Sequence, residues 1–320
     1  MPRELRRNVV LILAGLLASF PFVPNAHAEG SAHSSRLEII QDKPFVMVMV
    51  NGKGPFRFLI DTGTAGEAFI SKELAAQLAL PQSGHITLHD PSGLGGQKVP
   101  SVVVDSLQVA GVEFNGVKAA VLNLGIGNGA CQGLLGFALF RNYLVTLDYP
   151  NRRIALTPGD LKPDGDRSVL PFRMPEGVPI VTLSIGNMRI DAQLDSGGSG
   201  LSVPLRIASQ LKFLSRFDSL SNAHTLSTRF VLIGAKLAVN VNLGPYTFKR
   251  PFVEINPAFP LANFGSSPMQ GLVLTFDQKN RLVRINGAQK TLHLSAPPDT
   301  MRLQNAPDLA PADPSLVPVG

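Results

Sequence analysis

Two motifs in the chain each place an aspartate after a run of mostly apolar residues and before a hydroxyl residue and a glycine. They are Phe58 to Gly63, which reads FLIDTG, and Ala192 to Gly197, which reads AQLDSG. Two carboxyl groups held about 3 Å apart cannot both be ionised, so such a pair shares one proton. The charged group can take a proton from water, and that water attacks the carbonyl carbon while the neutral group donates a proton to the carbonyl oxygen. If Asp61 and Asp195 meet, they predict hydrolysis without a covalent acyl-enzyme, a metal or any other cofactor.

The residues that follow each aspartate have physical tasks in this scheme. Gly63 and Gly197 permit a tight turn and leave space for the opposite loop. Thr62 and Ser196 carry hydroxyls that can hydrogen-bond across to the partner loop and fix the two loops relative to each other. Each motif alone is also explained as a turn at the end of a strand, where Asp and Gly are common. That alternative does not explain why the surroundings of the two motifs are repeated as well.

The segments around the motifs recur in the same order, which indicates a duplicated chain. A hairpin turn containing Gly52 or Gly186 is expected before each motif, with that glycine nine residues before the aspartate. Later in each half, two residues precede a glycine: Leu134-Leu135 before Gly136, and Asn263-Phe264 before Gly265. An aspartate follows twelve residues after each of these glycines. The repeat makes the two Asp-hydroxyl-Gly motifs equivalent positions of one pattern.

Apolar residues alternate or form short blocks separated by Gly, Pro and Asn, which is typical of β-strands. The strands expected in the first half are 44–51, 56–60, 101–107, 144–148 and 153–156. Only two helices are expected, 71–78 with Ser71 as its N-cap and 204–211 with Pro204 at its first position. The predicted fold class is therefore all-β with short helices, built as two similar halves.

The N-terminus has the order of a secretory signal peptide: basic residues, an apolar run and the small-residue sequence Ala26-His27-Ala28. The apolar run is short for a membrane span and is broken by Pro21, so we expect cleavage and no stable membrane insertion afterwards. Export to the periplasm, or secretion beyond it, is predicted. The expected divisions are a signal peptide at 1–28, a first half at 37–158, a linker at 159–167, a second half at 168–292 and a disordered tail at 293–320.

Composition excludes several other functions. The single cysteine, Cys131, rules out an internal disulfide and a zinc site of several thiolates. The net charge is only +6 and its basic residues are scattered, so no nucleic-acid partner is predicted. His85 and His89 lack accompanying ligands, and the glycine-rich 125–129 lacks the context of a nucleotide loop. Ser199 does not complete a Gly-x-Ser-x-Gly motif, because position 201 is leucine.

The two motifs, the helix after each and the later hydrophobic-Gly sequences together resemble the signature of aspartic peptidases. The tandem layout resembles pepsin-like enzymes, whereas Gly133 to Gly136 (GLLG) with the following 145–149 (VTLDY) is more similar to bacterial retropepsin-like proteins. The resemblance spans nearly all of the chain after the signal peptide, to about residue 290. It implies the acid protease fold, with two β-barrel-like lobes related by a pseudo-twofold axis in a monomer. It also implies that Asp61 and Asp195 are the catalytic pair and that the substrate is a peptide or protein.

The same resemblance assigns supporting roles around the pair. Thr62 and Ser196 are implied to be the interlocking hydroxyls, and Thr64 is the hydroxyl residue that usually follows Asp-Thr-Gly. A flap over the cleft is expected at 85–99. The residues expected to support the pair are Thr62, Gly63, Thr64, Ser196 and Gly197, and the flap or cleft glycines are Gly93, Gly95 and Gly96.

Three positions depart from the family pattern. Gly198 stands where a Ser or Thr usually follows the second motif, Asn263 replaces an aliphatic residue, and the flap region 85–99 contains no tyrosine. These departures leave two alternatives open. One is a catalytically inactive peptide-binding or regulatory periplasmic protein on the same fold, and the other is a structural β-rich module whose motifs are only turns.

Overall fold

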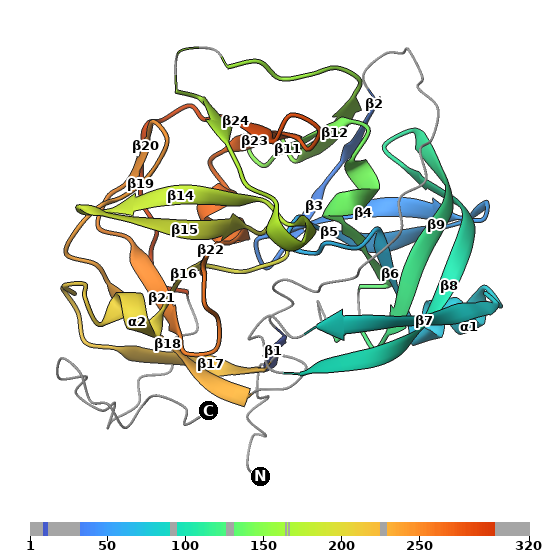
Figure 1. The fold of residues 1–320 in the computed structure, drawn as a ribbon, viewed down its shortest axis with the longest axis horizontal. Coiled ribbons are helices and arrows are strands. Elements are labelled where there is room, and N and C mark those ends of the chain that lie inside the picture. The colour runs from blue at the N-terminus through green and yellow to red at the C-terminus, as the bar shows by residue number, and fades with distance from the viewer. Residues whose placement is uncertain are drawn as a thin grey trace, which may run out of the picture.

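The computed structural model describes residues 9–11, 33–89, 95–125, 131–163, 165, 167–224 and 229–297. In this part of the chain the strands form sheets of 11, 8 and 6 strands, and the helices are short. Figure 1 shows the 8-stranded sheet on the right, the 11-stranded sheet on the left and the 6-stranded sheet above them. The prediction of a mostly β protein with short helices is confirmed.

The elements of the first half follow the order of the chain. They are β1 (Val9–Leu11), β2 (His33–Arg36), β3 (Glu38–Ile40), β4 (Lys43–Val50), β5 (Lys53–Asp61), β6 (Ala68–Ser71), α1 (Lys72–Gln77), β7 (Gln82–His89), β8 (Gly96–Val109), β9 (Val112–Leu122), β10 (Gly133–Gly136), the 3-10 helix η2 (Phe137–Phe140), β11 (Leu144–Asp148) and β12 (Arg153–Thr157).

The second half continues from the linker. Its elements are β13 (Val169–Pro171), the 3-10 helix η3 (Pro175–Gly177), β14 (Ile180–Ile185), β15 (Met188–Leu194), β16 (Leu201–Pro204), α2 (Leu205–Ala208), β17 (Asp218–His224), β18 (Arg229–Lys236), β19 (Val241–Leu243), β20 (Tyr246–Phe248), β21 (Phe252–Asn256), β22 (Ala262–Phe264), α3 (Ser266–Met269), β23 (Val273–Asp277), β24 (Leu282–Asn286) and β25 (Thr291–Leu292).

The five strands predicted in the first half are all present. β11 has the predicted bounds, β4 lies one residue earlier than predicted at both ends, and β12 extends one residue further. β8 is much longer than the predicted 101–107, because its first part pairs with β7 and its later part with β9. Its extent is therefore set by two different neighbours, which alternation along one segment does not reveal.

The two predicted helices form, with different accuracy. Helix α1 begins after Ser71, whose hydroxyl accepts a hydrogen bond from the Leu74 amide at 3.0 Å, as expected of an N-cap. Helix α2 ends at Ala208 rather than at residue 211. The Gln210 and Leu211 amides donate to carbonyls only three residues earlier, so the α-helical bonding does not continue. Pro204 is its N-cap residue and not its first helical residue, which corrects the prediction.

Both predicted hairpin turns are confirmed. Asn51 and Gly52 join β4 to β5 with φ of 48° and 71°, and Gly186 lies in the β14–β15 turn with φ of 56°. Positive φ at such turns matches the right-handed twist of the flanking strands and favours Asn and Gly. Each hairpin delivers its second strand to one of the Asp-hydroxyl-Gly motifs.

The order of strands around the two motifs is the same in both halves. In the 8-stranded sheet the order is β4-β5-β10-β6-β9-β8-β7, and in the 11-stranded sheet it is β14-β15-β22-β16-β21-β18-β17. The directions also agree: β10 pairs in parallel with β5 and antiparallel with β6, as β22 does with β15 and β16. The repeated sequence is thus matched by a repeated pattern of strand pairing.

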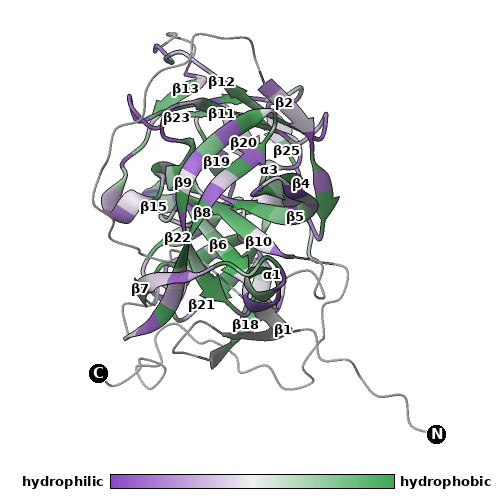
Figure 2. Ribbon diagram, turned by 90° about the vertical axis from the view of Figure 1, so that its right-hand side faces the viewer, coloured by the Kyte–Doolittle hydropathy of each residue, from purple (hydrophilic) through white to green (hydrophobic). Residues whose placement is uncertain are grey.

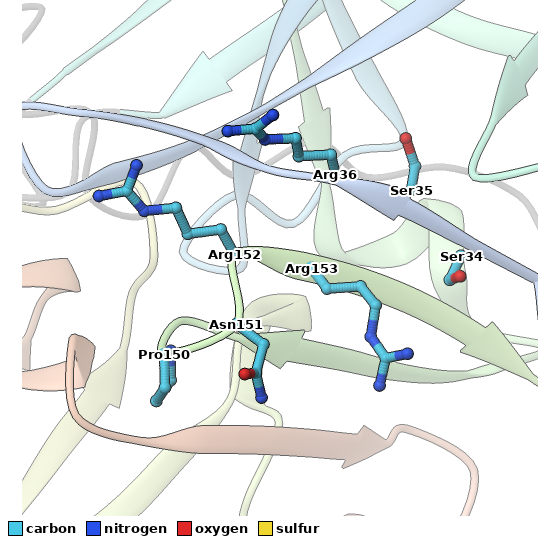
Figure 3. Close-up of a pocket in the computed structure, with 7 residues that line it drawn as sticks. All are labelled: Ser34, Ser35, Arg36, Pro150, Asn151, Arg152 and Arg153. Carbon is cyan, nitrogen blue, oxygen red and sulfur yellow. The ribbon is translucent and has the colours of Figure 1, made fainter.

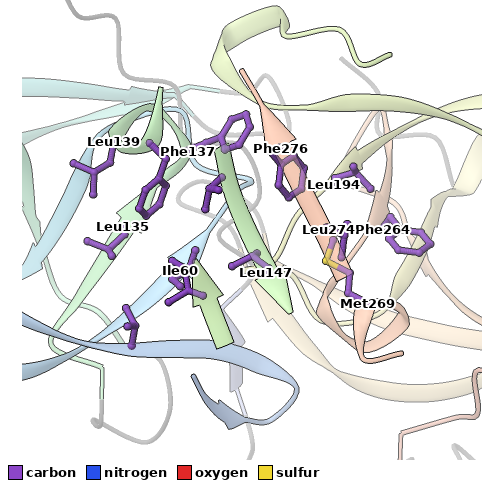
Figure 4. Close-up of a cluster of buried hydrophobic side chains, with 14 of the residues drawn as sticks. Ile60, Leu135, Phe137, Leu139, Leu147, Leu194, Phe264, Met269, Leu274 and Phe276 are labelled. Atoms are coloured by element: carbon purple, nitrogen blue, oxygen red, sulfur yellow. The ribbon is translucent and has the colours of Figure 1, made fainter. Parts of the chain in front are cut away.

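The 6-stranded sheet joins strands from both halves. β11 pairs antiparallel with β23, and Thr146 lies opposite Thr275 with their hydroxyl oxygens 2.9 Å apart. On the buried side Phe137 and Phe276 pack edge to face with ring centroids 5.4 Å apart, beside Leu147 and the other apolar side chains of Figure 4. One hydrophobic cluster therefore includes residues of both halves.

Hydropathy separates interior from exterior strands. Figure 2 shows β6, β10 and β21 in the hydrophobic colour, while α1 and parts of β7 are hydrophilic. Every residue of β6 and β10 is buried.

Within the described residues, no helix is both long and apolar enough to cross a membrane. β1, which lies in the segment predicted as a signal peptide, pairs in parallel with β17.

Candidate active site

The two aspartates lie at equivalent points of the strand pattern. Asp61 is the last residue of β5, and Asp195 directly follows β15. A short buried strand lies beside each: Gly136 of β10 is opposite Asp61, and the Phe264 carbonyl of β22 accepts the Asp195 amide at 3.0 Å. Both aspartates are completely buried. The structure therefore brings together the two residues that the sequence singled out.

Hydrogen bonds cross between the two motif loops in both directions. The Thr62 amide donates to the Ser196 hydroxyl at 3.0 Å, and the Ser196 amide donates to the Thr62 hydroxyl at 3.0 Å. Each hydroxyl in turn donates to the opposite strand, that of Thr62 to the Leu194 carbonyl at 2.7 Å and that of Ser196 to the Ile60 carbonyl at 2.8 Å. All these groups are buried, so the reciprocal bonds hold the loops in a fixed relation.

The glycine of each motif lies against the opposite aspartate. A Cβ atom on Gly63 would be 2.5 Å from Cγ of Asp195, and one on Gly197 would be 2.3 Å from Cγ of Asp61. Real Cβ atoms do not approach carbon this closely, so any side chain at either position would push the carboxyl groups apart. Glycine at these positions allows the carboxyl groups to approach.

The Asp61 carboxyl group accepts two hydrogen bonds from its own loop. Its Oδ1 accepts from the Gly63 amide at 2.8 Å and its Oδ2 from the Thr64 hydroxyl at 3.0 Å. Burial raises the pKa of Asp61 well above its ordinary value, and the neighbouring Asp195 raises it further, while Thr64 and the Lys43 charge lower it. Asp61 therefore holds a proton more readily than an ordinary aspartate does.

The Asp195 carboxylate accepts hydrogen bonds from three donors. Its Oδ1 accepts from the Gly197 amide at 2.9 Å and the Gly198 amide at 2.8 Å, and its Oδ2 accepts from the Asn263 side-chain amide at 2.8 Å. Donors to a carboxylate stabilise its charged form. Asp195 therefore has one more hydrogen-bond donor than Asp61.

A family model of aspartyl proteases matches residues 46–139. Those residues form an aspartyl protease domain. Membership of that family suggests a peptidase with peptide substrates. The aspartyl protease domain contains Asp61 and its neighbours Thr62, Gly63 and Thr64, whereas Asp195 lies beyond it. No curated protein matches the chain.

Two side chains support the loops from the opposite half of the chain. Gln193 donates from its side-chain amide to the carbonyl of Gly63 at 3.0 Å, and Lys43 donates from Nζ to the carbonyl of Gly197. Sequence reasoning singled out neither residue. Lysine is rarely buried, so no local pattern signals that Lys43, which is 7% exposed, lies inside.

Lys43 is the cation nearest to the pair. Burial lowers its pKa, while the charges of Asp195, Asp61 and Glu254 act in the opposite direction. The pKa of Glu254 is raised to about 7 by burial, against the opposing effects of Lys43 and a hydrogen bond from the Gly200 backbone. A buried cation between carboxyl groups favours their ionised forms.

The predicted flap corresponds to β7 and β8, which follow the first motif within the aspartyl protease domain. Gly96 begins β8 and Gly95 precedes it, both exposed, whereas Gly93 lies outside the described residues. Figure 1 shows the β7–β8 hairpin extending toward the β17–β18 hairpin of the other half, which occupies the same place in the strand order. The role of these glycines as a flap remains a prediction.

Neither a metal site nor the described pocket involves the aspartates. Among the described residues, no three His, Cys, Asp or Glu side chains are grouped to hold a metal ion. A pocket at the surface near β2 and β12 is shown in Figure 3. Its lining residues are Ser34, Ser35, Arg36, Pro150, Asn151, Arg152 and Arg153. None of these lining residues belongs to the two Asp-hydroxyl-Gly motifs.

Proposed function

We propose that this chain is an exported aspartic endopeptidase in which Asp61 and Asp195 form the catalytic pair. The observation that carries the proposal is that two interlocked loops hold the two buried carboxyl groups against each other's glycines. The aspartyl protease domain supports the reaction class. Carboxyl groups forced together in this way share one proton, which is the state that acid–base hydrolysis requires.

The donors around the pair assign the two roles. Asp195, with three donors, is the base that takes a proton from the attacking water. Asp61 is the acid that donates its proton to the peptide carbonyl oxygen as that oxygen becomes negative. The tetrahedral intermediate then breaks its C–N bond as Asp195 gives its proton to the departing nitrogen. Asp61 regains a proton from a hydroxyl of the intermediate as the carboxylic acid forms, so the pair again holds one proton.

The proposal includes two lobes related by a pseudo-twofold axis. The matching strand orders and the reciprocal Thr62–Ser196 bonds support it. So does the pairing of Thr146 with Thr275, because these threonines are equivalent in the sequence repeat and lie opposite each other. A residue that faces its own repeat equivalent is expected where a twofold axis passes between strands. One chain then supplies both halves of the site and works as a monomer.

Export belongs to the same proposal. The basic N-terminus, apolar run and Ala26-His27-Ala28 motif support removal of 1–28 and release into the periplasm or beyond. The N-terminal residue of protein recovered from an exporting bacterial host tests this point. A mature chain beginning near Glu29 is expected.

Two conservative substitutions test the catalytic pair. Asp61→Asn and Asp195→Asn keep the size of each side chain but remove the shared proton, so kcat/KM on a mixed peptide library should fall by about 10²–10⁴-fold. Asp105→Asn, at an exposed position of β8, is the matched control and should retain activity. Cleavage that survives either substitution in the pair would eliminate this mechanism.

The same assay distinguishes the alternative of an inactive relative. A wild-type protein that binds ordinary peptides, cleaves none from acid to neutral pH and ignores hydroxyl-bearing transition-state mimics would be a peptide-binding protein on this fold. An active peptidase binds the mimic more tightly than an ordinary peptide of the same sequence.

A further inference from the structure

The two aspartates obtain a side-chain hydrogen bond from different places. In the first half, the hydroxyl of Thr64, three residues after Asp61, donates to Oδ2 of that aspartate at 3.0 Å. The corresponding residue after Asp195 is Gly198, which has no side chain. Oδ2 of Asp195 instead accepts from Nδ2 of Asn263 at 2.8 Å, across 68 positions of the sequence.

Asn263 occupies the space that a side chain on residue 198 would need. A Cβ atom on Gly198 would lie 2.4 Å from Nδ2 of Asn263 and 2.6 Å from Oδ2 of Asp195. No real Cβ atom tolerates either distance. Glycine at 198 and asparagine at 263 are therefore compatible with each other, while a larger residue at 198 is incompatible with the asparagine.

In the first half, the residue three positions after the aspartate has a side chain that donates, and the residue on the neighbouring short strand is apolar. The residue of β10 that corresponds to Asn263 is Leu134, because Leu134 lies opposite Leu59 as Asn263 lies opposite Gln193. Leu134 is buried in an apolar cluster, and in this half Thr64 supplies the donor. One half thus has threonine with leucine, and the other has glycine with asparagine.

We propose that Asn263 and Gly198 are a compensating pair, in which the Asn263 amide supplies to Asp195 the hydrogen bond that the Thr64 hydroxyl supplies to Asp61. Asn263 is then a positioning residue that holds the Asp195 carboxylate in its ionised form. This inference rests on the proposed aspartic peptidase activity. The two departures from the family pattern then have one role, which is to give Asp195 the side-chain hydrogen bond that Thr64 gives Asp61.

The unpartnered atom of Asn263 supports this assignment. Its Oδ1 is buried and has no hydrogen-bond partner among the described residues. An unpaired buried acceptor is unfavourable, so satisfying local polar groups does not account for an asparagine here. The bond that it does make is to the charged oxygen of Asp195, which is the strongest kind of acceptor available to an amide.

The other charged or titratable groups near Asp195 come from separate elements. They are Asp61 at the end of β5, Lys43 of β4, Tyr149 after β11, Glu254 of β21, which faces Lys43, and Asp42 in the turn before β4. None of them lies at positions 198 or 263. Substitutions at those two positions therefore change the donor to Asp195 and leave this set of residues unchanged.

The test uses the processed protein with Asn263→Leu, Gly198→Thr and the double substitution, which copies the first half. Asn263→Leu should lower kcat by about 10–100-fold with little change in KM, since it removes a donor to a charged group. The acidic limb of the pH–rate profile should move up by about one pH unit, because the ionised pair is stabilised less. The double variant should recover most of both losses.

The inference would be overturned if Asn263→Leu left kcat and the acidic limb unchanged. It would also be overturned if the double variant folded but was no more active than Asn263→Leu. Should Asn263→Leu fail to fold, Asn263→Ala removes the same donor without added bulk and is expected to show the same shift. These results are independent of the Asp61→Asn assay, which tests the peptidase itself.

A second readout needs no activity. Gly198→Thr should lower the Tm strongly when residue 263 is asparagine and much less when it is leucine. The reason is that the asparagine amide occupies the space that a side chain at position 198 needs. Additive changes in Tm across the four proteins would show that the two residues do not act as a pair. This outcome would reject the inference even in a protein that cleaves nothing.

Discussion

Asp61 and Asp195 are held by different sets of donors although both are buried in loops that interlock. Asp61 receives the Gly63 amide and the Thr64 hydroxyl, whereas Asp195 receives two backbone amides and the side chain of Asn263. In the proposed mechanism, unequal donors separate the roles of two chemically identical groups, because the carboxylate with more hydrogen-bond donors retains the charge. The asymmetry comes from one additional backbone amide, that of Gly198, and from the exchange of a threonine hydroxyl for an asparagine amide.

Lys43 should influence the limb of the pH profile that reports on Asp61. Its charge lowers the pKa of Asp61, so Lys43→Met should raise that pKa and move the alkaline limb to higher pH, by about 0.5–1 unit. The sign follows from the need for a protonated Asp61, which is lost as pH rises through its pKa. Lys53→Met, at an exposed position of β5, is the matched control. An alkaline limb that stays in place would mean that Lys43 acts only through its bond to Gly197.

At the level of single elements, short strands and one helix fix the position of the motifs. β10 and β22 are each inserted beside the strand that ends at an aspartate, and both are buried or nearly so. The register of β10 is fixed, since a shift of one residue would place a leucine where Gly133 or Gly136 has no room for a side chain. Helix α1 follows β6 directly and is held at its start by Ser71.

Removing the N-cap of α1 should destabilise the fold without affecting the chemistry. Ser71→Ala leaves the Leu74 amide without its hydroxyl acceptor and should cost about 1 kcal/mol of the free energy of unfolding. Urea denaturation of the variant measures this cost, and kcat should be unchanged. Ser34→Ala, at an exposed position of β2, serves as the control. Equal stability of the two variants would contradict the capping role.

At the scale of the whole molecule, the two halves depend on each other. The 6-stranded sheet joins them through β11 and β23, and the aromatic contact of Phe137 with Phe276 lies beneath it. Lys43 and Gln193 each reach from one half to a glycine carbonyl in the loop of the other half. A site assembled from both halves loses its geometry if either half moves, so we expect activity and global stability to be linked.

The pH dependence of global stability should report on Glu254, which is partly buried on β21. Its pKa is raised to about 7 in the folded protein, so the protonated form is favoured there. Its contribution to stability is complete below its unfolded value of 4.5 and is lost as pH rises through about 7. Because the side chain is partly exposed, we expect this contribution to be only about 1–2 kcal/mol.

Thermal unfolding of Glu254→Gln tests this expectation. Between pH 4.5 and 7.5 the Tm of the wild type should fall by a few degrees relative to the variant, while the effect of Asp61 is common to both proteins. Glu113→Gln, at an exposed position of β9, should follow the wild-type curve. Parallel curves for Glu254→Gln and the wild type would show that Glu254 does not titrate in this range.

The sequence by itself determined the paired motifs, the turns before them and the β character of both halves. These features are local: a positive-φ turn needs Asn51 and Gly52, and an alternating strand carries its own pattern. It predicted the Ser71 cap for the same reason. The lengths of β8 and α2 were predicted less well, since they depend on strands and turns elsewhere in the molecule.

Only the tertiary structure decided how the pair of aspartates is surrounded. Asn263 reaches Asp195 over 68 positions and Lys43 reaches Gly197 over 154, and no periodicity encodes such contacts. In the sequence Gly198 and Asn263 are two separate departures from a family pattern. Their meaning depends on the 2.4 Å that would separate a Cβ at 198 from the amide at 263, a distance that exists only after the chain has folded.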